Sequence, residues 1–220
     1  MIHFENVSKH YDSQTALRNI TFSIEKGEMA FITGPSGSGK TTLLKLIYFS
    51  EKPDEGIILI DGKELNGLKE SEIPILRRKI GFVFQDFRLL NNRNVFENIA
   101  LALRIRGIND QDVKTRVFDS LKTVNLRHKA DYYPDTLSGG EQQRVVLARA
   151  IVSEPAVILA DEPTGNVDPD TSAGIMRTFK NINATGTTIV IATHNRDLFK
   201  DTGRMVLKLD SGNLVSEERG

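Results

Sequence analysis

The residues with the clearest chemistry form the glycine-rich run Gly34-Pro35-Ser36-Gly37-Ser38-Gly39-Lys40-Thr41-Thr42. The run fits the pattern G-x-x-x-x-G-K-[ST], in which glycines let backbone N–H groups close around phosphate oxygens at a helix N-terminus. Lys40 is expected to neutralise the β- and γ-phosphates of a nucleotide, and the Thr41 hydroxyl to help hold Mg²⁺. By itself, this loop predicts nucleotide binding and leaves the fate of the nucleotide open.

Two carboxylates, Asp161 and Glu162, follow the apolar run 157–160. Such a run is typical of a strand buried in a parallel sheet, whose carboxyl edge binds ligands. Asp161 is expected to reach the Mg²⁺ shell, and Glu162 to orient or deprotonate a water molecule. His194 follows a similar run, 187–192, and is expected at the same edge. Alone, these residues could be a polar turn and a structural histidine, but the phosphate loop upstream favours the catalytic interpretation.

The elements that must position these groups can be predicted from periodicity. Residues 2–7 and 15–25 alternate apolar and polar side chains, and residues 57–60 lead into a turn, so the N-terminal quarter is predicted to be partly antiparallel β-structure. A short buried strand over 29–32 runs into the phosphate loop, and residues 43–47 have helical spacing.

Helical patterns dominate from about residue 92 to 155, with one helix capped by Asp110. Another helix is expected to begin near Pro169, and the C-terminal tail reads as a hairpin across Ser211-Gly212. These patterns predict a single domain over residues 1–220. Residues of approximately 1–90 and 156–220 would form a nucleotide-binding core with a β subdomain, and residues 91–155 a helical subdomain.

Composition excludes several classes of function. The 220 residues include 29 Lys+Arg and 29 Asp+Glu, so no overall basic field draws the chain to nucleic acid, and no nucleic-acid partner is expected. With no cysteine, there is no disulfide framework or thiolate metal site. No run approaches 18 apolar residues, and the N-terminus lacks a secretory apolar core, so we expect a cytoplasmic chain without a membrane span.

The run 137–144, Leu-Ser-Gly-Gly-Glu-Gln-Gln-Arg, carries a second anion-binding feature. Ser138 and Glu141 form a capping box that is expected to start a helix over 141–152. Gly139 and Gly140 each cost a helix about 1 kcal/mol relative to alanine, which indicates a backbone that another group must approach closely. The N–H groups of a helix N-terminus bind anions.

This run resembles the LSGGQ-type signature of ATP-binding cassette (ABC) proteins, and the resemblance covers the whole chain in order. It implies an α/β fold: a P-loop NTPase nucleotide-binding domain with an N-terminal antiparallel β subdomain and an inserted α-helical subdomain. Tyr11 resembles the aromatic residue that stacks on adenine. Gln85 resembles the Q-loop glutamine that contacts Mg²⁺ and water, and His194 the switch histidine. Asn166 and Asp168 resemble the D-loop, although Asp168 also reads as an ordinary helix N-cap.

The resemblance implies an ATPase that works as a homodimer. Two ABC cassettes pair head to tail, so Ser138, Gly139, Gly140 and Glu141 of one copy would close over the ATP bound by the phosphate loop of the other. Glu162 would act as the catalytic base and His194 would position water and the γ-phosphate. ATP and Mg²⁺ are the implied cofactors.

The segments 77–90 and 160–166 resemble ABC members that serve bacterial cell division, with Asn91 as a departure where relatives usually place proline. This resemblance implies a peripheral location on the inner face of the cell membrane, at the septum. It also implies a membrane-protein partner and a signal that activates peptidoglycan hydrolases. The partner would contact the segment 87–97, through the four apolar side chains Phe87, Leu89, Leu90 and Phe96. The alternative is that these four side chains belong to the subdomain core.

Two other functions within the family are alternatives. The first is the ATPase of a lipoprotein-release or macrolide-export transporter, which has a similar D-loop. The second is a soluble ABC ATPase acting on DNA or ribosomes. This is disfavoured because only 97 residues separate Lys40 from Ser138, without sustained heptads, and the chain carries one cassette. A GTPase would need an Asn-Lys-x-Asp motif, which the sequence lacks.

Overall fold

The computed structural model describes residues 1–12 and 14–220. Its strands form two sheets, one in the order β2-β1-β4-β5 and one in the order β10-β9-β3-β8-β7-β6. The first sheet is antiparallel and contains β1 (Ile2–Tyr11), β2 (Gln14–Ile24), β4 (Glu55–Ile60) and β5 (Lys63–Glu64). The second contains β3 (Met29–Thr33), β6 (Ile80–Val83), β7 (Val157–Asp161), β8 (Thr188–Ala192), β9 (Met205–Asp210) and β10 (Asn213–Arg219). Within it, only the pairing of β9 with β10 is antiparallel.

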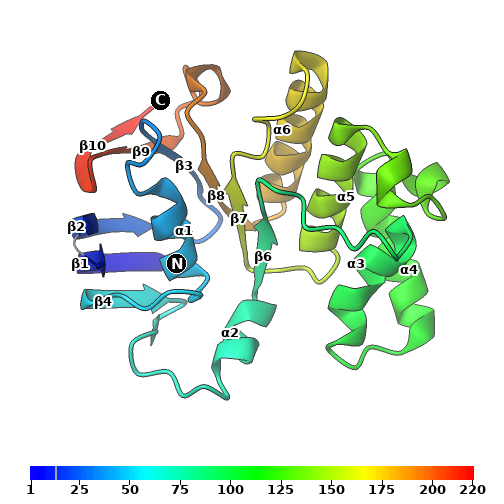
Figure 1. The fold of residues 1–220 in the computed structure, drawn as a ribbon, viewed down its shortest axis with the longest axis horizontal. Coiled ribbons are helices and arrows are strands. Elements are labelled where there is room, and N and C mark those ends of the chain that lie inside the picture. Colours follow the sequence, from blue (N-terminus) through cyan, green and yellow to red (C-terminus); the bar gives the residue numbers. More distant parts are fainter. Residues whose placement is uncertain (13) are drawn as a thin grey trace.

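Helices cover the second sheet on both faces (Figure 1). They are α1 (Lys40–Ile47), α2 (Ile73–Arg78), α3 (Val95–Arg104), α4 (Asp110–Thr123), α5 (Gly139–Ile151) and α6 (Pro169–Ala184), with short 3₁₀ turns at Arg127–Lys129, Pro134–Thr136 and Arg196–Leu198. The green helices α3, α4 and α5 gather beyond the β6 edge, on the opposite side of the molecule from the antiparallel sheet (Figure 1). In the described part of the chain, every helix is too short or too polar to cross a lipid bilayer.

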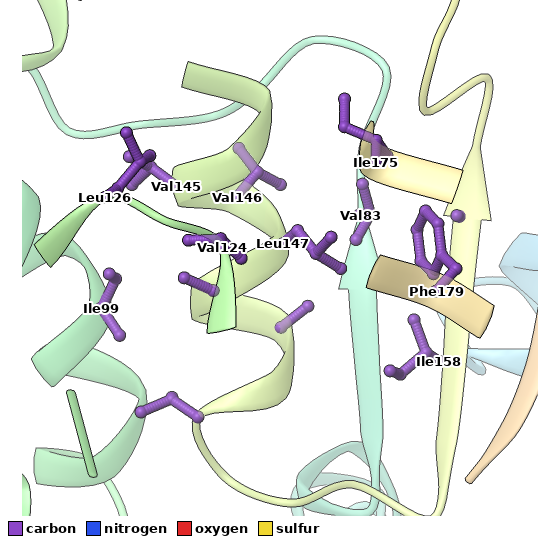
Figure 2. Close-up of a cluster of buried hydrophobic side chains, with 14 of the residues drawn as sticks. Val83, Ile99, Val124, Leu126, Val145, Val146, Leu147, Ile158, Ile175 and Phe179 are labelled. Carbon is purple, nitrogen blue, oxygen red and sulfur yellow. The ribbon is translucent and has the colours of Figure 1, made fainter. Parts of the chain in front are cut away.

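The central strands are buried on both faces, and successive side chains enter different cores. Met29 and Phe31 of β3 join a cluster with α3–α6, whereas Ala30 and Ile32 join a cluster with α1 and the antiparallel sheet. Helix α1 is therefore enclosed between the two sheets. On the other face, α5 lies between α3 and the β6–β7 edge, and its Leu147 points toward the sheet (Figure 2).

The predicted fold class is confirmed: an antiparallel β region comes first, and helices are inserted before the second sheet resumes at β7. The hairpin across Ser211-Gly212 and the helix beginning at Pro169 also form as predicted. Two helix starts were predicted wrongly. Asn109, not Asp110, caps α4 by accepting a hydrogen bond from the Asp112 N–H. Helix α5 starts at Gly139 rather than residue 141, because Ser138 is its N-cap and Glu141 is therefore the third helical residue.

Candidate functional site

The candidate site lies where three parallel strands end side by side. Ile32 of β3 pairs with Ala192 of β8, and Ala192 also pairs with Asp161 of β7. The Thr193 N–H donates to the Ile32 carbonyl, so the register holds for one residue beyond the strands. The glycine-rich loop, the two carboxylates and His194 therefore leave the sheet at one edge, as expected for a ligand site of a parallel sheet.

The glycine-rich loop needs glycine at defined positions. Gly37 (φ +77°) and Gly39 (φ +106°) lie in the left-handed region. A Cβ atom on Gly39 would also lie only 2.7 Å from the Ala16 carbonyl oxygen, so the loop packs closely on β2. Helix α1 begins directly after Gly39, and the buried Lys40 ammonium donates to the carbonyls of Gly34 and Pro35 at 2.9 Å each. These bonds hold the positive charge inside the loop at a helix N-terminus.

Two of the residues expected to hold Mg²⁺ are already in contact. The Thr41 hydroxyl donates to Asp161 Oδ2 at 2.8 Å. Burial raises the pKa of Asp161, while the Thr41 hydrogen bond opposes the rise. A buried carboxylate beside a hydroxyl fits Mg²⁺, which prefers oxygen ligands and usually takes one or two carboxylates together with substrate phosphates. The pair therefore suits a magnesium ion that arrives with a nucleotide.

The second carboxylate, that of Glu162, belongs to a residue with a strained backbone. Glu162 has φ +46°, which is uncommon for a residue with a side chain and is frequent at functional sites. Its backbone N–H donates to the Ala192 carbonyl at 2.9 Å, which anchors the turn to the neighbouring strand. Glu162 Oε1 then accepts from the backbone N–H of His194 at 3.1 Å and lies 2.9 Å from His194 Nδ1.

The contact between Glu162 and His194 fixes how the imidazole is used. Because an ionised carboxylate only accepts hydrogen bonds, Nδ1 must carry the proton and Nε2 remains for a ligand. The Glu162 side chain is 12% exposed and that of His194 is 69% exposed. The Glu162 carboxylate is thus held at the base of the site, while the His194 ring is exposed to solvent.

These groups surround a cavity of about 730 Å³. It is lined by Ala16, Pro35, Ser36, Gly37, Gly39, Lys40, Thr41, Thr42, Gln85, Asp161, Glu162, Gly165, Asn166 and His194. The structure therefore brings the phosphate loop together with the predicted catalytic residues Gln85, Glu162 and His194. Ala16 was missed by the sequence analysis, because its place depends on the pairing of β2 with β1 and no local motif marks it.

Several predicted residues lie just outside the cavity lining. Gly34 and Ser38 support the loop from behind: the Ser38 carbonyl accepts from the Gly212 N–H, and Gly34 packs against β9. Tyr11 ends β1 and is 37% exposed. Burial and the nearby Glu51 raise the pKa of Tyr11, while Thr42 opposes the rise, so the phenol lies beside the phosphate-loop helix.

The signature residues do not line the cavity of their own chain. Ser138 and Glu141 form the predicted capping box of α5, and the backbone hydrogen bond from Ser138 lowers the pKa of Glu141. A Cβ on Gly140 would lie 2.6 Å from Thr171 Cγ2 of α6. Asp168 accepts from the Thr171 N–H and caps α6, and its hydrogen bonds with the side chain and the backbone of Thr171 lower its pKa. The signature turn and the D-loop thus share one surface beside the cavity.

The four residues expected to contact a membrane partner differ in exposure. Phe87, Leu89 and Phe96 are partly buried and pack against the helical core, which favours the alternative assignment for these three. Leu90 is 40% exposed. A groove of about 480 Å³ lies near this segment, with Phe82, Phe84, Ala102 and Ile105 among its lining residues. The sequence analysis missed this groove because its walls come from segments far apart in the chain.

Comparison with known proteins agrees with this geometry. A family model described as ABC transporter matches residues 17–165. The chain is 50% identical to the cell division ATP-binding protein FtsE of Bacillus subtilis, over 99% of this chain and 96% of that protein. It is 49% identical to FtsE of Escherichia coli K12, over 97% of each.

Solved structures give the same result for the fold. The chain superposes with a TM-score of 0.93 on the dimeric structure of a post-hydrolysis state of the ATP-binding cassette MJ0796 bound to ADP and Pi. That protein is 37% identical, and the match covers 100% of this chain and 98% of the other. The cbiO1 protein of Clostridium perfringens, part of the ABC transporter complex cbiONQ, matches with a TM-score of 0.91 at 31% identity over 99% of this chain and 88% of the other.

Proposed function

Because the chain belongs to the ABC transporter family of ATP-binding cassettes, we propose that it is the ATP-hydrolysing subunit of a membrane complex in cell division. The observation that carries this proposal is the cavity in which a phosphate loop, the carboxylates of Asp161 and Glu162 and a histidine meet at one sheet edge. Relatives named FtsE match over nearly the whole chain at 49–50% identity, which supports the cell-division role.

In the proposed reaction, Glu162 accepts the proton of the attacking water as the general base. Its contact with His194 Nδ1 keeps both side chains oriented, so Nε2 can contact the γ-phosphate and the water. Gln85, which also lines the cavity, is suited to contact water and the metal. Asn166 of the D-loop adds a polar side chain to the wall.

Thr41, Asp161 and Gln85 would hold Mg²⁺ together with the nucleotide phosphates. When bound, the ion neutralises the charge that develops on the phosphoryl oxygens. Lys40 and the backbone N–H groups of the loop supply the remaining positive potential. Tyr11, beside Thr42, would stack on the adenine ring.

Each ATP site would be completed by a second copy. The signature residues of this chain lie outside its own cavity, which suits a role in a partner's site. The matching structures of MJ0796 are dimeric, which supports the same assembly here. Ser138, Gly139, Gly140 and Glu141 of one copy would then face the γ-phosphate held by the other, where the N-terminus of α5 favours negative charge.

The complex would include a membrane protein resembling FtsX, and ATP turnover would send a signal through it that activates peptidoglycan hydrolases. The chain would then lie on the inner face of the cell membrane, at the septum. Leu90 is the predicted contact residue that remains accessible, and the nearby apolar groove could receive a helix of the partner.

Capture from membranes tests this partnership. The tagged wild-type chain is expected to recover a membrane protein with an extracytoplasmic domain, whereas Leu90→Asp should recover at least about tenfold less, because it places a charge in an apolar contact. Ile57→Asp is the matched control, since Ile57 is 38% exposed and lies on β4 of the antiparallel sheet, away from the groove.

Equal capture by the Leu90 and Ile57 variants would contradict the contact surface. Recovery of a lipoprotein-release or macrolide-export transporter would replace cell division by transport as the output. Recovery of DNA or ribosomes alone would contradict the membrane assignment as a whole.

A further inference from the structure

The turn that follows Gln85 is strained. Phe87 (φ +29°) and Arg88 (φ +52°) are consecutive residues with side chains in the left-handed region. The Arg88 side chain folds back over this turn, with its guanidinium 4.1 Å from the centroid of the Phe84 ring and Nε 3.1 Å from Asp86 Oδ1. Such a turn persists only where the surrounding structure holds it.

One side chain from another element holds this turn. Arg149 Nη1 donates to the Arg88 carbonyl at 2.6 Å, and Nη2 donates to the Phe87 carbonyl at 2.8 Å. Burial lowers the pKa of Arg149, with the nearby Arg88 adding to the effect, so the guanidinium is partly shielded from water where it makes these bonds. The planar fork of a guanidinium suits two adjacent acceptors, which a lysine ammonium cannot match in the same way.

Arg149 and the signature turn lie on the same helix. Helix α5 begins at Gly139 and Arg149 is in its last turn, about 15 Å along the axis at the usual rise of a helix. Between these points, Val145, Val146 and Leu147 are fully or almost fully buried in the cluster that joins the helical insert to the sheet (Figure 2). A helix packed this firmly moves as one body.

We propose that Arg149 is a positioning residue that fixes Gln85 relative to the signature helix by clamping the turn at Phe87 and Arg88. The inference rests on the proposed function. Gln85 faces the ATP cavity of its own copy, while Gly139 and Gly140 face the ATP of the second copy. When the signature of one copy closes over the ATP of the second copy, α5 and Arg149 transmit this closure to Gln85, which contacts water beside the ATP of its own copy.

Steady-state kinetics of Arg149→Met test this role. Methionine keeps an apolar stem and removes both donors. The expected result is a fall in kcat of about tenfold with a KM for ATP within about twofold of wild type, because water positioning is lost while the phosphate loop is untouched. Arg149→Lys should recover part of the rate, since it restores one charged donor. If the methionine variant fails to fold, the lysine variant carries the same comparison.

The matched control is Arg106→Met. Arg106 also donates to two backbone carbonyls, those of Ser153 and Arg78, and burial likewise lowers its pKa, but neither carbonyl belongs to the turn after Gln85. Its kcat should stay within about twofold of wild type. This variant measures the cost of losing a different arginine that donates to two backbone carbonyls.

A double variant distinguishes positioning from general packing. If Arg149 acts through Gln85, adding Arg149→Met to Gln85→Ala should change kcat by less than about twofold. An equal tenfold loss in both backgrounds would overturn the proposal, as would a wild-type kcat in Arg149→Met. Absence of hydrolysis by the wild-type chain would instead contradict the proposed function, so the two failures are distinguishable.

Discussion

Glu162→Gln is expected to lower the rate of ATP hydrolysis about a thousandfold while ATP still binds. The amide has nearly the shape of the carboxylate and can keep a contact with the backbone N–H of His194 through its carbonyl oxygen. It cannot take a proton from water. Phosphate release measured under saturating ATP, together with nucleotide affinity, separates the two effects.

Glu154→Gln is the matched control for this variant. Glu154 has φ +50°, close to that of Glu162, but it precedes β7 instead of following it and is exposed far from the cavity. Its hydrolysis rate should equal that of wild type. If Glu162→Gln hydrolysed ATP at the wild-type rate, Glu162 would not be the base. The Glu162→Gln chain should also double its mass in light scattering when ATP is present, because a dimer that cannot hydrolyse its ATP stays closed.

Lys40→Met should weaken ATP binding about a hundredfold, and hydrolysis should be lost with it at ordinary ATP concentrations. Charge-assisted hydrogen bonds to phosphate are worth about 1.5–3 kcal/mol, and 1.4 kcal/mol corresponds to a factor of ten. Lys40 is the buried cation of the loop, so no other side chain of α1 can replace it. Equilibrium titration with a fluorescent ATP analogue measures the loss.

Lys45→Met provides the control on the same helix. Lys45 is exposed, and its ammonium lies 4.0 Å from Glu51, so its removal should leave the affinity within about twofold. A Lys40 variant that binds ATP as tightly as the Lys45 variant would contradict the assignment of the loop.

Much of this site is predictable because its determinants are local. The phosphate loop is a continuous run that ends at α1, and each strand-end residue is marked by the apolar run before it. The capping box at Ser138 could be predicted for the same reason, since its partner lies three residues away. The predicted N-cap of α4 was wrong by one residue, because Asn109 and Asp110 are both good caps and only the backbone geometry decides between them.

Features that depend on contacts between distant segments were not predictable. The left-handed backbone of Glu162 accompanies a hydrogen bond from its N–H to Ala192 of another strand, and no sequence motif encodes this contact. The Arg149 clamp joins residues 61 and 62 positions apart. Phe87 and Phe96 could equally have faced a partner or the core, since both environments select apolar side chains, and they pack against the core.

The central claim is that two copies build each ATP site, and Gly139→Asp offers a clean way to damage the signature. A Cβ at Gly139 meets only the Asn166 carbonyl oxygen, at 3.7 Å, so the side chain fits. An acidic residue in the first helical turn also favours the helix. The variant should therefore fold, yet place a negative charge where the γ-phosphate of the other copy would approach.

The most direct measurement is the hydrolysis rate of a mixture of the Lys40→Met and Gly139→Asp chains. In a mixed dimer, one site combines the intact Lys40 of the Gly139→Asp chain with the intact Gly139 of the Lys40→Met chain, so this site is whole. The other site carries both defects. If half of the dimers are mixed, the mixture should regain a measurable rate of up to about a quarter of the wild-type rate, although each variant alone is inactive. A mixture as inactive as its two components would contradict the shared site.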